Sequence, residues 1–508
     1  MSELETTAAA APATEPRNDA GAPDGAALLE EILTSGHLVR SNDEEIRADE
    51  ARRARDLISA FVDQVVDQRA FIDRKTQDAV KAVERMIAAI DEHIGAQLDA
   101  ILHHPKLQDL EARWRGLDYL VKNSETGTSL KIRVLDVTKK ELGKDLSAAV
   151  EFDRSTLFKK VYEEEYGTFG GDPFGLVIGD YEFDAGGPDI QMLSGLAGVA
   201  AAAHAPFLAG ASPQIFDMDG FTTLDVPGDL AKICERSALA PWREFRKSED
   251  SRYIALALPR VLLRVPYGAA TAPVEGFNYE EKVEGHADYL WGNAAYALGQ
   301  RITSAFAIHH WCAAIRGVEG GGLVEGLPFY TFKSAGEDVI KCPTETAITD
   351  RRENELSELG FISLCYRKNS NQAAFFGGAT VNKPATYNLA SANANARLSA
   401  QLPYILATSR FAHYIKVMMR DKVGSFASRD NVASYLNNWI ADYVLLNDNA
   451  GHETKARLPL REARIDVTDV PGKPGAYRAI AFLRPHFQLN ELTVSMRLVA
   501  ELPPPAAA

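Results

Sequence analysis

The chain has 508 residues, of which 46% are hydrophobic and 25% charged. This balance is typical of a globular protein and excludes a wholly disordered, collagen-like or mucin-like chain. The length exceeds what one hydrophobic core usually fills, so we expect two or more packed units. Asp and Glu number 70 against 55 Lys and Arg, a net charge of -15. A net negative surface repels phosphate backbones, so we predict no nucleic-acid partner.

Cysteine usage and hydropathy indicate a cytoplasmic protein without a membrane segment. The four cysteines are too sparse for a disulfide scaffold, and no two have metal-ligand spacing. The longest apolar stretch, Leu196 to Ala211, is broken by His204 and Pro206 and is too weakly apolar to span a bilayer. The first residues contain no apolar segment of a secretory signal. We therefore predict a cytoplasmic location with no direct membrane insertion.

Residues 1–55 are expected to form a disordered tail with one short amphipathic helix near 26–36. The helix is indicated by four apolar residues at helical spacing, Leu28, Leu29, Ile32 and Leu33. Two interpretations remain open: a packed flank of the next domain, or a tethered motif that folds into a groove on a partner. The polar stretch Ser41 to Glu50 favours the tethered motif.

Residues 56–125 are expected to form a helical region. A first apolar stripe is spaced by threes and fours: Val80, Val83, Ile87, Ile90, Ile94, Leu98 and Ile101. A second stripe follows after His103, His104 and Pro105: Leu107, Leu110, Trp114, Leu117 and Val121. Pro105 suits the first turn of the second helix. The stripes predict helices packed on each other or on a sheet.

Residues 126–386 are expected to form an α/β core domain, a mixed sheet with helices on its faces. A strand, helix, strand order is predicted from Phe174 to Asp180, Asp189 to Ala203 and Pro206 to Ala211, and such a unit makes part of the sheet parallel. Further strands are predicted at Leu130 to Val134, Tyr253 to Leu258, Cys312 to Ile315, around Ala347, Phe361 to Tyr366 and Ala374 to Phe376, with a helix at Trp291 to Ile308.

Residues 387–508 are expected to form a C-terminal α+β domain. Its helical part runs to about Leu446, and Pro403 should kink or restart the helix. Three strands are predicted after it: Ala463 to Val470, Tyr477 to Arg484 and Leu492 to Leu498. The last has alternating apolar residues, Leu492, Val494, Met496 and Leu498. A terminal strand with a free edge can recruit another chain, so we predict inter-subunit pairing here.

The sequence contains no local motif for catalysis, for a cofactor or for a metal. The glycine-rich segment Gly317 to Gly326 lacks the Lys of a phosphate loop, so a tight structural loop is the better interpretation. Adjacent histidines such as His309 and His310 project to different faces of a helix and rarely share a metal; they and their counterparts His103 and His104 are expected to satisfy carbonyls at helix ends. An enzyme whose active site is assembled from distant positions remains the alternative function.

Five cations crowd one helical stretch of this acidic chain. They are Arg410, Lys416, Arg420, Lys422 and Arg429. Two interpretations fit these cations equally well: a solvated helix face, or a surface that meets an acidic partner.

Long segments of the chain resemble the TssC/VipB family, the large sheath subunits of the bacterial type VI secretion system. They include AILHHPKLQDLEARWRGLDYLV (Ala100 to Val121), EEEYGTFGGDPFGLVIGDYEF (Glu163 to Phe183) and FLRPHFQLNELTVSMRLVAEL (Phe482 to Leu502). The resemblance covers about Asp56 to nearly the end of the chain.

The resemblance implies a structural, non-enzymatic role and a fold similar to that of phage tail sheath proteins. It implies pairing with the small subunit TssB and polymerisation around a tube of Hcp rings, on a baseplate at the inner membrane. It further implies exchanged terminal strands between protomers, and recycling by a ClpV-type AAA+ ATPase that grips the helix containing Leu28, Leu29, Ile32 and Leu33. Arg410, Lys416, Arg420 and Lys422 are candidates for facing the tube.

Overall fold

A computed structural model describes residues 44–67, 76–226, 228–334, 337–423, 425, 428–472, 476–486 and 488. The chain divides into two compact units, Met1–Ala96 and Gln97–Ala508. Within the described ranges, no helix is both long and apolar enough to cross a membrane.

The first unit holds helix α2 (Glu44–Asp67) and most of helix α3 (Thr76–Leu102). Helix α2 begins within the stretch that we predicted to be a polar tether, so the helical region starts earlier than expected. Its run of Glu, Arg and Ala residues has high helix propensity, which explains the early start. In α3, the predicted stripe forms, but Ile87, Ile90 and Ile94 are exposed in the chain rather than packed on a second helix or a sheet.

The core of the second unit is a mixed sheet with the strand order β1-β2-β3-β9-β10-β6. The first four strands are parallel, and β10 is antiparallel to both of its neighbours. The strands are β1 (Val177–Phe183), β2 (Phe207–Ala211), β3 (Ile254–Leu258), β6 (Leu323–Val324), β9 (Ile362–Tyr366) and β10 (Ala373–Phe375). Parallel strands covered on both faces are continuously apolar, as β2 and β3 are.

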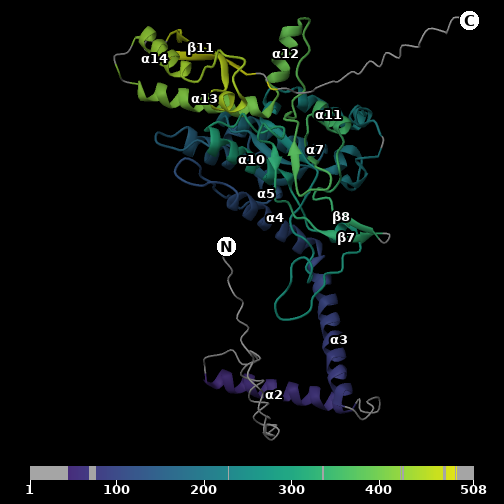
Figure 1. Cartoon of the computed structure of the whole chain (residues 1–508). Coiled ribbons are helices and arrows are strands. Elements are labelled where there is room, and N and C mark those ends of the chain that lie inside the picture. Colours follow the sequence, from purple (N-terminus) through teal and green to yellow (C-terminus); the bar gives the residue numbers. More distant parts are fainter. Residues whose placement is uncertain are drawn as a thin grey trace, which may run out of the picture. The chain divides into compact units, whose positions relative to one another are not determined.

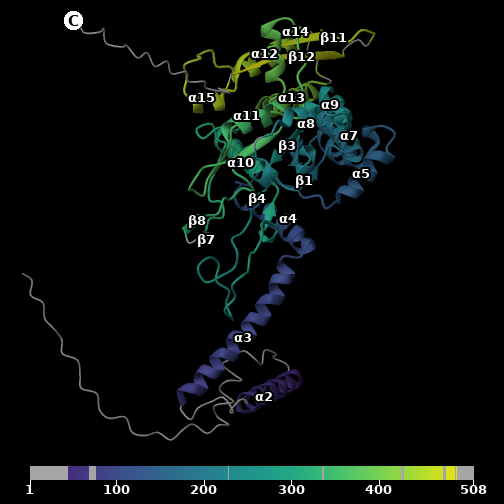
Figure 2. The same ribbon diagram turned by 90° about the vertical axis from the view of Figure 1, so that its right-hand side faces the viewer.

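Alternate residues of these strands enter two different hydrophobic clusters. Phe207 and Leu256 belong to the cluster of helix α7 (Gly187–Ala203), which connects β1 to β2. Leu208 and Ala255 belong to the cluster of helix α10 (Ala294–His309) on the other face. Figure 1 labels both helices in this domain, and in Figure 2 the strands β1 and β3 lie between α10 and α7. The predicted α/β class with helices on both faces is therefore confirmed.

Further helices of the unit lie around this core. They are α4 (Pro105–Lys122), α5 (Lys139–Ala148), α6 (Thr156–Phe158), α8 (Leu230–Cys234), α9 (Ala240–Lys247), α11 (Asp350–Glu358) and α12 (Ala390–Leu398), with a π-helix η3 (Lys159–Tyr166). Pro105 occupies the first turn of α4, as predicted. Gly116 of α4 packs against the ring of Tyr296 on α10, whereas Trp114 is 65% exposed. Only part of the second predicted stripe is therefore covered.

Three predicted strands are wrong, because a strand needs a partner that the local sequence does not reveal. The segment at 130–134 is largely exposed and pairs with no strand among the described residues. The segment at 312–315 is a loop. Near Ala347 the chain makes only an isolated bridge, from Thr344 to Val261. The remaining predicted strands of the core form, but β1 lies three residues later than the run from Phe174 to Asp180 suggested.

Two short antiparallel pairs extend from the core domain. Strand β4 (Val261–Leu262) pairs with β5 (Trp291–Gly292), and they enclose a long loop, residues 263–290. Strand β7 (Thr331–Ser334) pairs with β8 (Glu337–Ile340). Figure 2 shows both features on the same side of the core domain.

The C-terminal part contains helices α13 (Leu402–Asp421), α14 (Arg429–Ala441) and α15 (His452–Arg457) and the hairpin of β11 (Leu460–Asp469) and β12 (Tyr477–Pro485). Pro403 restarts the helix, since it lies in the first turn of α13 after α12 has ended. Helices α13 and α14 pack with the hairpin through Phe411, Leu436 and Ile465. The predicted strands at 463–470 and 477–484 are confirmed, while Leu492, Val494, Met496 and Leu498 lie outside the described residues.

Candidate functional site

The β11–β12 hairpin presents an open strand edge. Nine residue pairs join its two strands, from Leu460 with Pro485 to Asp469 with Tyr477. Next to the hairpin turn the Val470 N–H donates to Ala476 O, which fixes the alternation of the antiparallel ladder. The backbone groups of Tyr477, Ala479, Ala481 and Leu483 are therefore directed away from β11. No partner for them is found among the described residues.

The opposite edge of the hairpin, on β11, is closed by a side chain. The Asn437 amide of α14 donates to Ile465 O at 2.7 Å, and its carbonyl oxygen accepts from Ile465 N at 2.9 Å. One amide thus occupies the outward N–H and C=O of Ile465, in the middle of the β11 edge, and interrupts the row of groups that a further strand would need. Ile480 and Phe482 on β12 are exposed, so the open edge also carries apolar surface. An added strand would therefore pair with β12 rather than β11.

Helix α13 uses two of the four predicted tube-facing cations for contacts within the chain. The Lys416 Nζ lies 3.4 Å from the ring centre of Tyr166, at the end of the π-helix η3. The Arg420 guanidinium donates to Tyr166 O at 2.9 Å and to Thr168 O at 2.7 Å. The last carbonyls of a helix are unpaired within it, so Arg420 acts as a C-terminal cap for η3.

The other two cations lie on aromatic rings of their own domain. The Arg410 guanidinium lies 4.7 Å from the ring centre of Tyr414, and the Lys422 Nζ lies 4.5 Å from that of Tyr435. Lys422 is exposed, which leaves its charge accessible to a partner. Arg429 pairs with Asp430 and Asp469. The structure thus separates a structural pair, Lys416 and Arg420, from the exposed Lys422.

A group of buried aromatic residues lies beneath α13. The His413 Nε2–H donates to Ala203 O at 2.9 Å, and the His413 ring lies 5.1 Å from that of Tyr166. Burial, with a contribution from neighbouring cations, lowers the pKa of His413 to about 4. Burial also lowers the pKa of His204 and raises the pKa of Tyr166 to about 12. These groups are neutral at pH 7, as expected for packing rather than proton transfer.

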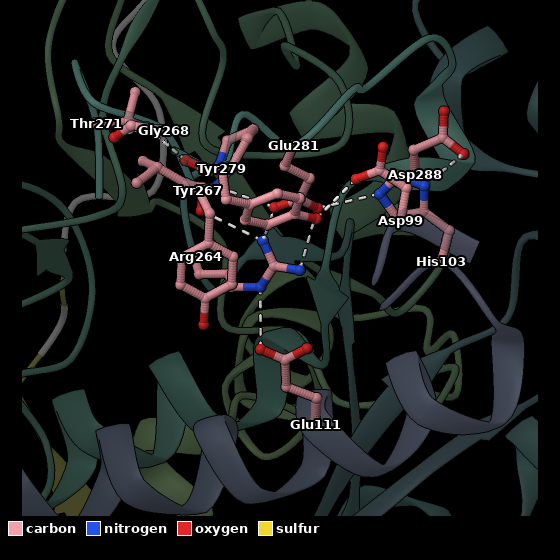
Figure 3. Close-up of polar contacts among 12 residues, drawn as sticks. Asp99, His103, Glu111, Arg264, Tyr267, Gly268, Thr271, Tyr279, Glu281 and Asp288 are labelled. Carbon is pink, nitrogen blue, oxygen red and sulfur yellow. Dashed lines mark hydrogen bonds and ion pairs between the residues drawn. The ribbon is translucent and has the colours of Figure 1, made fainter. Parts of the chain in front are cut away.

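A polar cluster anchors the 263–290 loop, and Figure 3 shows it. The Arg264 guanidinium donates to both carboxylate oxygens of Glu281, at 2.6 and 3.2 Å, and to Glu111 of α4 at 2.9 Å. Burial alone would raise the pKa of Glu281, but bonds from Arg264 and from the Tyr267 N–H outweigh it, and the pKa is lowered. Both members of this pair are therefore charged.

Helix α3 reaches the same cluster through its last turns. His103 lies 3.0 Å from Glu281, and the Tyr279 hydroxyl donates to Asp99 at 2.7 Å. His104 caps α4 by accepting from the Lys106 N–H. The prediction that these two histidines satisfy carbonyls at a helix end is therefore wrong. The His103 side chain contacts a carboxylate, and that of His104 accepts from a backbone N–H.

This cluster is suited to holding backbone segments, not to catalysis. Its cation is shared between two carboxylates. Two of its hydroxyls are occupied as donors, that of Tyr279 to Asp99 and that of Thr271 to Pro266 O. Across the described ranges, His, Cys, Asp and Glu form no group of three that could hold a metal. The glycine-rich loop closes on itself, with Gly317 N donating to Phe375 O and Gly322 N to Gly317 O, as a structural loop should.

Sequence reasoning missed Asn437 and the Arg264 cluster. The partners in the cluster are 153 residues apart for Arg264 and Glu111 and 178 for His103 and Glu281. No local spacing could have joined them. The N-terminal helix residues Leu28, Leu29, Ile32 and Leu33 lie outside the described residues.

Two family descriptions match the chain, and together they define its class, a tail sheath subunit. Residues 84–382 match "EvpB/VC_A0108, tail sheath N-terminal domain", and residues 391–502 match "EvpB/VC_A0108, tail sheath gpW/gp25-like domain". The chain belongs to this VipB family of type VI secretion sheath proteins. Its members are structural proteins, so the enzyme alternative is not supported and the predicted family is confirmed.

A curated relative and two solved structures are similar to the chain. The type VI secretion system sheath protein TssC1 of Pseudomonas aeruginosa strain PAO1 is 48% identical over 463 residues, covering 89% of this chain and 92% of that protein. A chain of the anti-feeding prophage baseplate has a TM-score of 0.36 at 12% identity, covering 75% of this chain and 86% of its own. A chain of the contracted anti-feeding prophage sheath has a TM-score of 0.31 at 12% identity, covering 60% and 66%.

Proposed function

We propose that this sheath protein pairs with the small subunit TssB and polymerises into a contractile cylinder around a tube of Hcp rings. The family supports the sheath role. The open edge of β12 carries the proposal for assembly, because a long strand with one uncovered side and exposed apolar residues is a template for another chain.

The terminal strand at Leu492, Val494, Met496 and Leu498 is the proposed partner for such an edge on a neighbouring protomer. Backbone hydrogen bonds depend little on side-chain identity, so a strand linkage persists while the surrounding contacts repack. Contraction is then a change between two lattice packings of the same subunits. A difference of a few kcal/mol per protomer, multiplied along the polymer, is enough to drive it.

Membership of the family supports the remaining partners of this proposal. The sheath docks in the cytoplasm through a baseplate at the inner membrane. Lys422 is available to an acidic tube surface, whereas Lys416 and Arg420 are engaged in contacts within the chain. A ClpV-type ATPase recycles the contracted sheath by gripping the helix with Leu28, Leu29, Ile32 and Leu33. No cofactor takes part.

Substitution Ala481→Pro tests the open edge. Ala481 directs its N–H away from β11, so proline removes one donor from the free side and leaves the ladder with β11 intact. We expect co-expression with TssB to give no sedimenting tubules, while the unfolding midpoint of the chain changes little.

The matched control is Ala481→Val, which keeps the N–H at the same position and favours a strand. It should form normal tubules in electron micrographs. Normal tubules from the proline variant would refute strand addition at β12.

A further inference from the structure

A cavity of about 350 Å³ lies where the glycine-rich loop, α13, α15 and the end of β12 meet. Its apolar wall is formed by small or rigid side chains: Ala313, Ala314, Phe376, Ala407, Pro459 and Pro485. A mostly apolar pocket with a few convergent polar groups is the usual form of a small-ligand site. No function assigned to the chain so far uses this cavity.

Two of its polar side chains lack a partner among the described residues. His486 is 8% exposed, and its Nε2 has no hydrogen-bond partner. The carbonyl oxygen of the Gln488 side chain is also buried without one, although its amide nitrogen donates to Ala313 O at 2.8 Å. The buried Nε2 of His486 can donate a hydrogen bond to an anion that enters the cavity. The Gln488 oxygen is an acceptor and gains no partner from an anion.

The two charged side chains that line the cavity, those of Arg316 and Lys455, are cationic. Arg316 comes from the glycine-rich loop, and His452 and Lys455 come from α15. Burial lowers the pKa of Arg316, but a guanidinium remains protonated in proteins. Two acidic residues, Asp448 and Glu353, lie nearby without lining the cavity. Lys455 donates to the backbone oxygen of Asp448, and the Glu353 carboxylate interacts electrostatically with Arg316. The cavity itself therefore favours an anion.

We propose that this cavity binds an aliphatic carboxylate, either as a free small acid or as the Glu or Asp side chain of a neighbouring chain. Lys455, Arg316 and His486 supply the charges and a donor for one carboxylate. The alanine and proline wall suits a short hydrocarbon chain. Inorganic phosphate fits less well, because it presents polar oxygens on every side, including toward the apolar wall.

Isothermal titration of the full chain with propionate tests the site. We expect saturable binding that Lys455→Met weakens at least tenfold. The control is Arg457→Met on the same helix, whose exposed side chain pairs with Glu453 and does not line the cavity; it should bind as the unchanged protein does. Ala313→Val, which narrows the cavity without changing charge, should also weaken binding if the lysine variant fails to fold.

The proposal is overturned if propionate does not bind, if neither cavity variant weakens binding, or if phosphate binds as tightly. Repeating the titration on tubules distinguishes a free small acid from the carboxylate side chain of a neighbouring chain. Only this second titration rests on the proposed assembly. Binding lost in tubules identifies a neighbouring side chain as the occupant. Binding retained in tubules identifies a free acid.

Discussion

Arg264 connects three separate segments of the chain at a single guanidinium. Its side chain is 7% exposed, and that of Glu281 is 1% exposed. A buried pair of this kind contributes little net stability over an apolar pair, but removal of one partner leaves an uncompensated charge. Its effect is therefore to fix where the 263–290 loop leaves the domain.

We expect Glu281→Gln to lower the free energy of unfolding by about 3 kcal/mol, the lower end of the usual range for a broken buried pair, because Glu111 still faces Arg264. Urea denaturation of the full chain measures the change. Asp118→Asn, in an exposed pair with Lys122 on α4, should change it by less than about 1 kcal/mol. Equal effects of the two substitutions would contradict the role of the cluster.

His413 should make the stability of the chain depend on pH. Its pKa in the folded state is about 4, against an ordinary value of 6.5. Between these values the unfolded chain binds a proton that the folded chain does not, so stability falls as the pH falls from about 6.5 toward 4. Below about pH 4 both states are protonated and the loss ends.

We expect His413→Gln to flatten this slope by up to about 1.4 kcal/mol per pH unit, the effect of one proton. His204 also has a lowered pKa, so part of the slope remains. Urea midpoints between pH 7.5 and 4.5 measure it. His93→Gln, on the exposed surface of α3, serves as control. An unchanged slope in the His413 variant would show that another group titrates.

At the scale of elements, α13 both closes the π-helix η3 and carries an exposed cation. Two substitutions separate these roles. Arg420→Gln removes the cap from Tyr166 O and Thr168 O and should cost about 1–2 kcal/mol of stability, within the range for a lost cap. Lys422→Glu should leave stability nearly unchanged and weaken retention of the Hcp tube within the sheath.

Thermal unfolding and co-sedimentation of the tube measure the two effects. If Lys422→Glu tubules retain the tube normally, this end of α13 faces something other than the tube.

The sequence predicted those elements whose pattern is set locally. The apolar runs of β2 and β3, the α7 helix between them and the turn between β11 and β12 could be located because a strand buried on both faces, a helix and a tight turn each have a short-range signature. The segments at 130–134 and 312–315 have the same alternation or apolar content but no partner strand. Pairing depends on residues far along the chain, so no local pattern decides it.

The candidate sites were predictable to the same limited extent. The free hairpin edge follows from strand count and position. The choice of β12 over β11 as the open edge depends on Asn437, a polar residue of α14. Its contact with β11 could not be predicted without the fold. The contacts of Lys416 and Arg420 with the end of η3 likewise could not be predicted, because η3 and α13 are far apart in the sequence.

At the scale of the whole molecule, the N-terminal helix should act independently of assembly. We expect Leu29→Asp with Ile32→Asp to leave tubules normal and to prevent their disassembly by the ATPase, because the apolar face would no longer enter a groove. Light scattering after addition of ATPase and ATP measures disassembly. Glu31→Ala, on the opposite face, should have no effect.

A peptide of residues 26–40 with the two aspartates should likewise lose binding to the ATPase N-terminal domain. Retained binding would show that the recognition element lies elsewhere.

The Tyr404 hydroxyl makes hydrogen bonds to the backbone of two residues near the end of the described chain. It donates to His486 O at 2.9 Å and accepts from Gln488 N at 3.2 Å. Tyr404 lies in the first turn of α13, directly after Pro403. Mechanical tension applied to the residues beyond Gln488 is therefore transmitted to the start of this helix before it can peel β12 from β11. A pull on the tail would be borne by the helix axis, which resists extension, and not by the ladder, which would open one bond at a time.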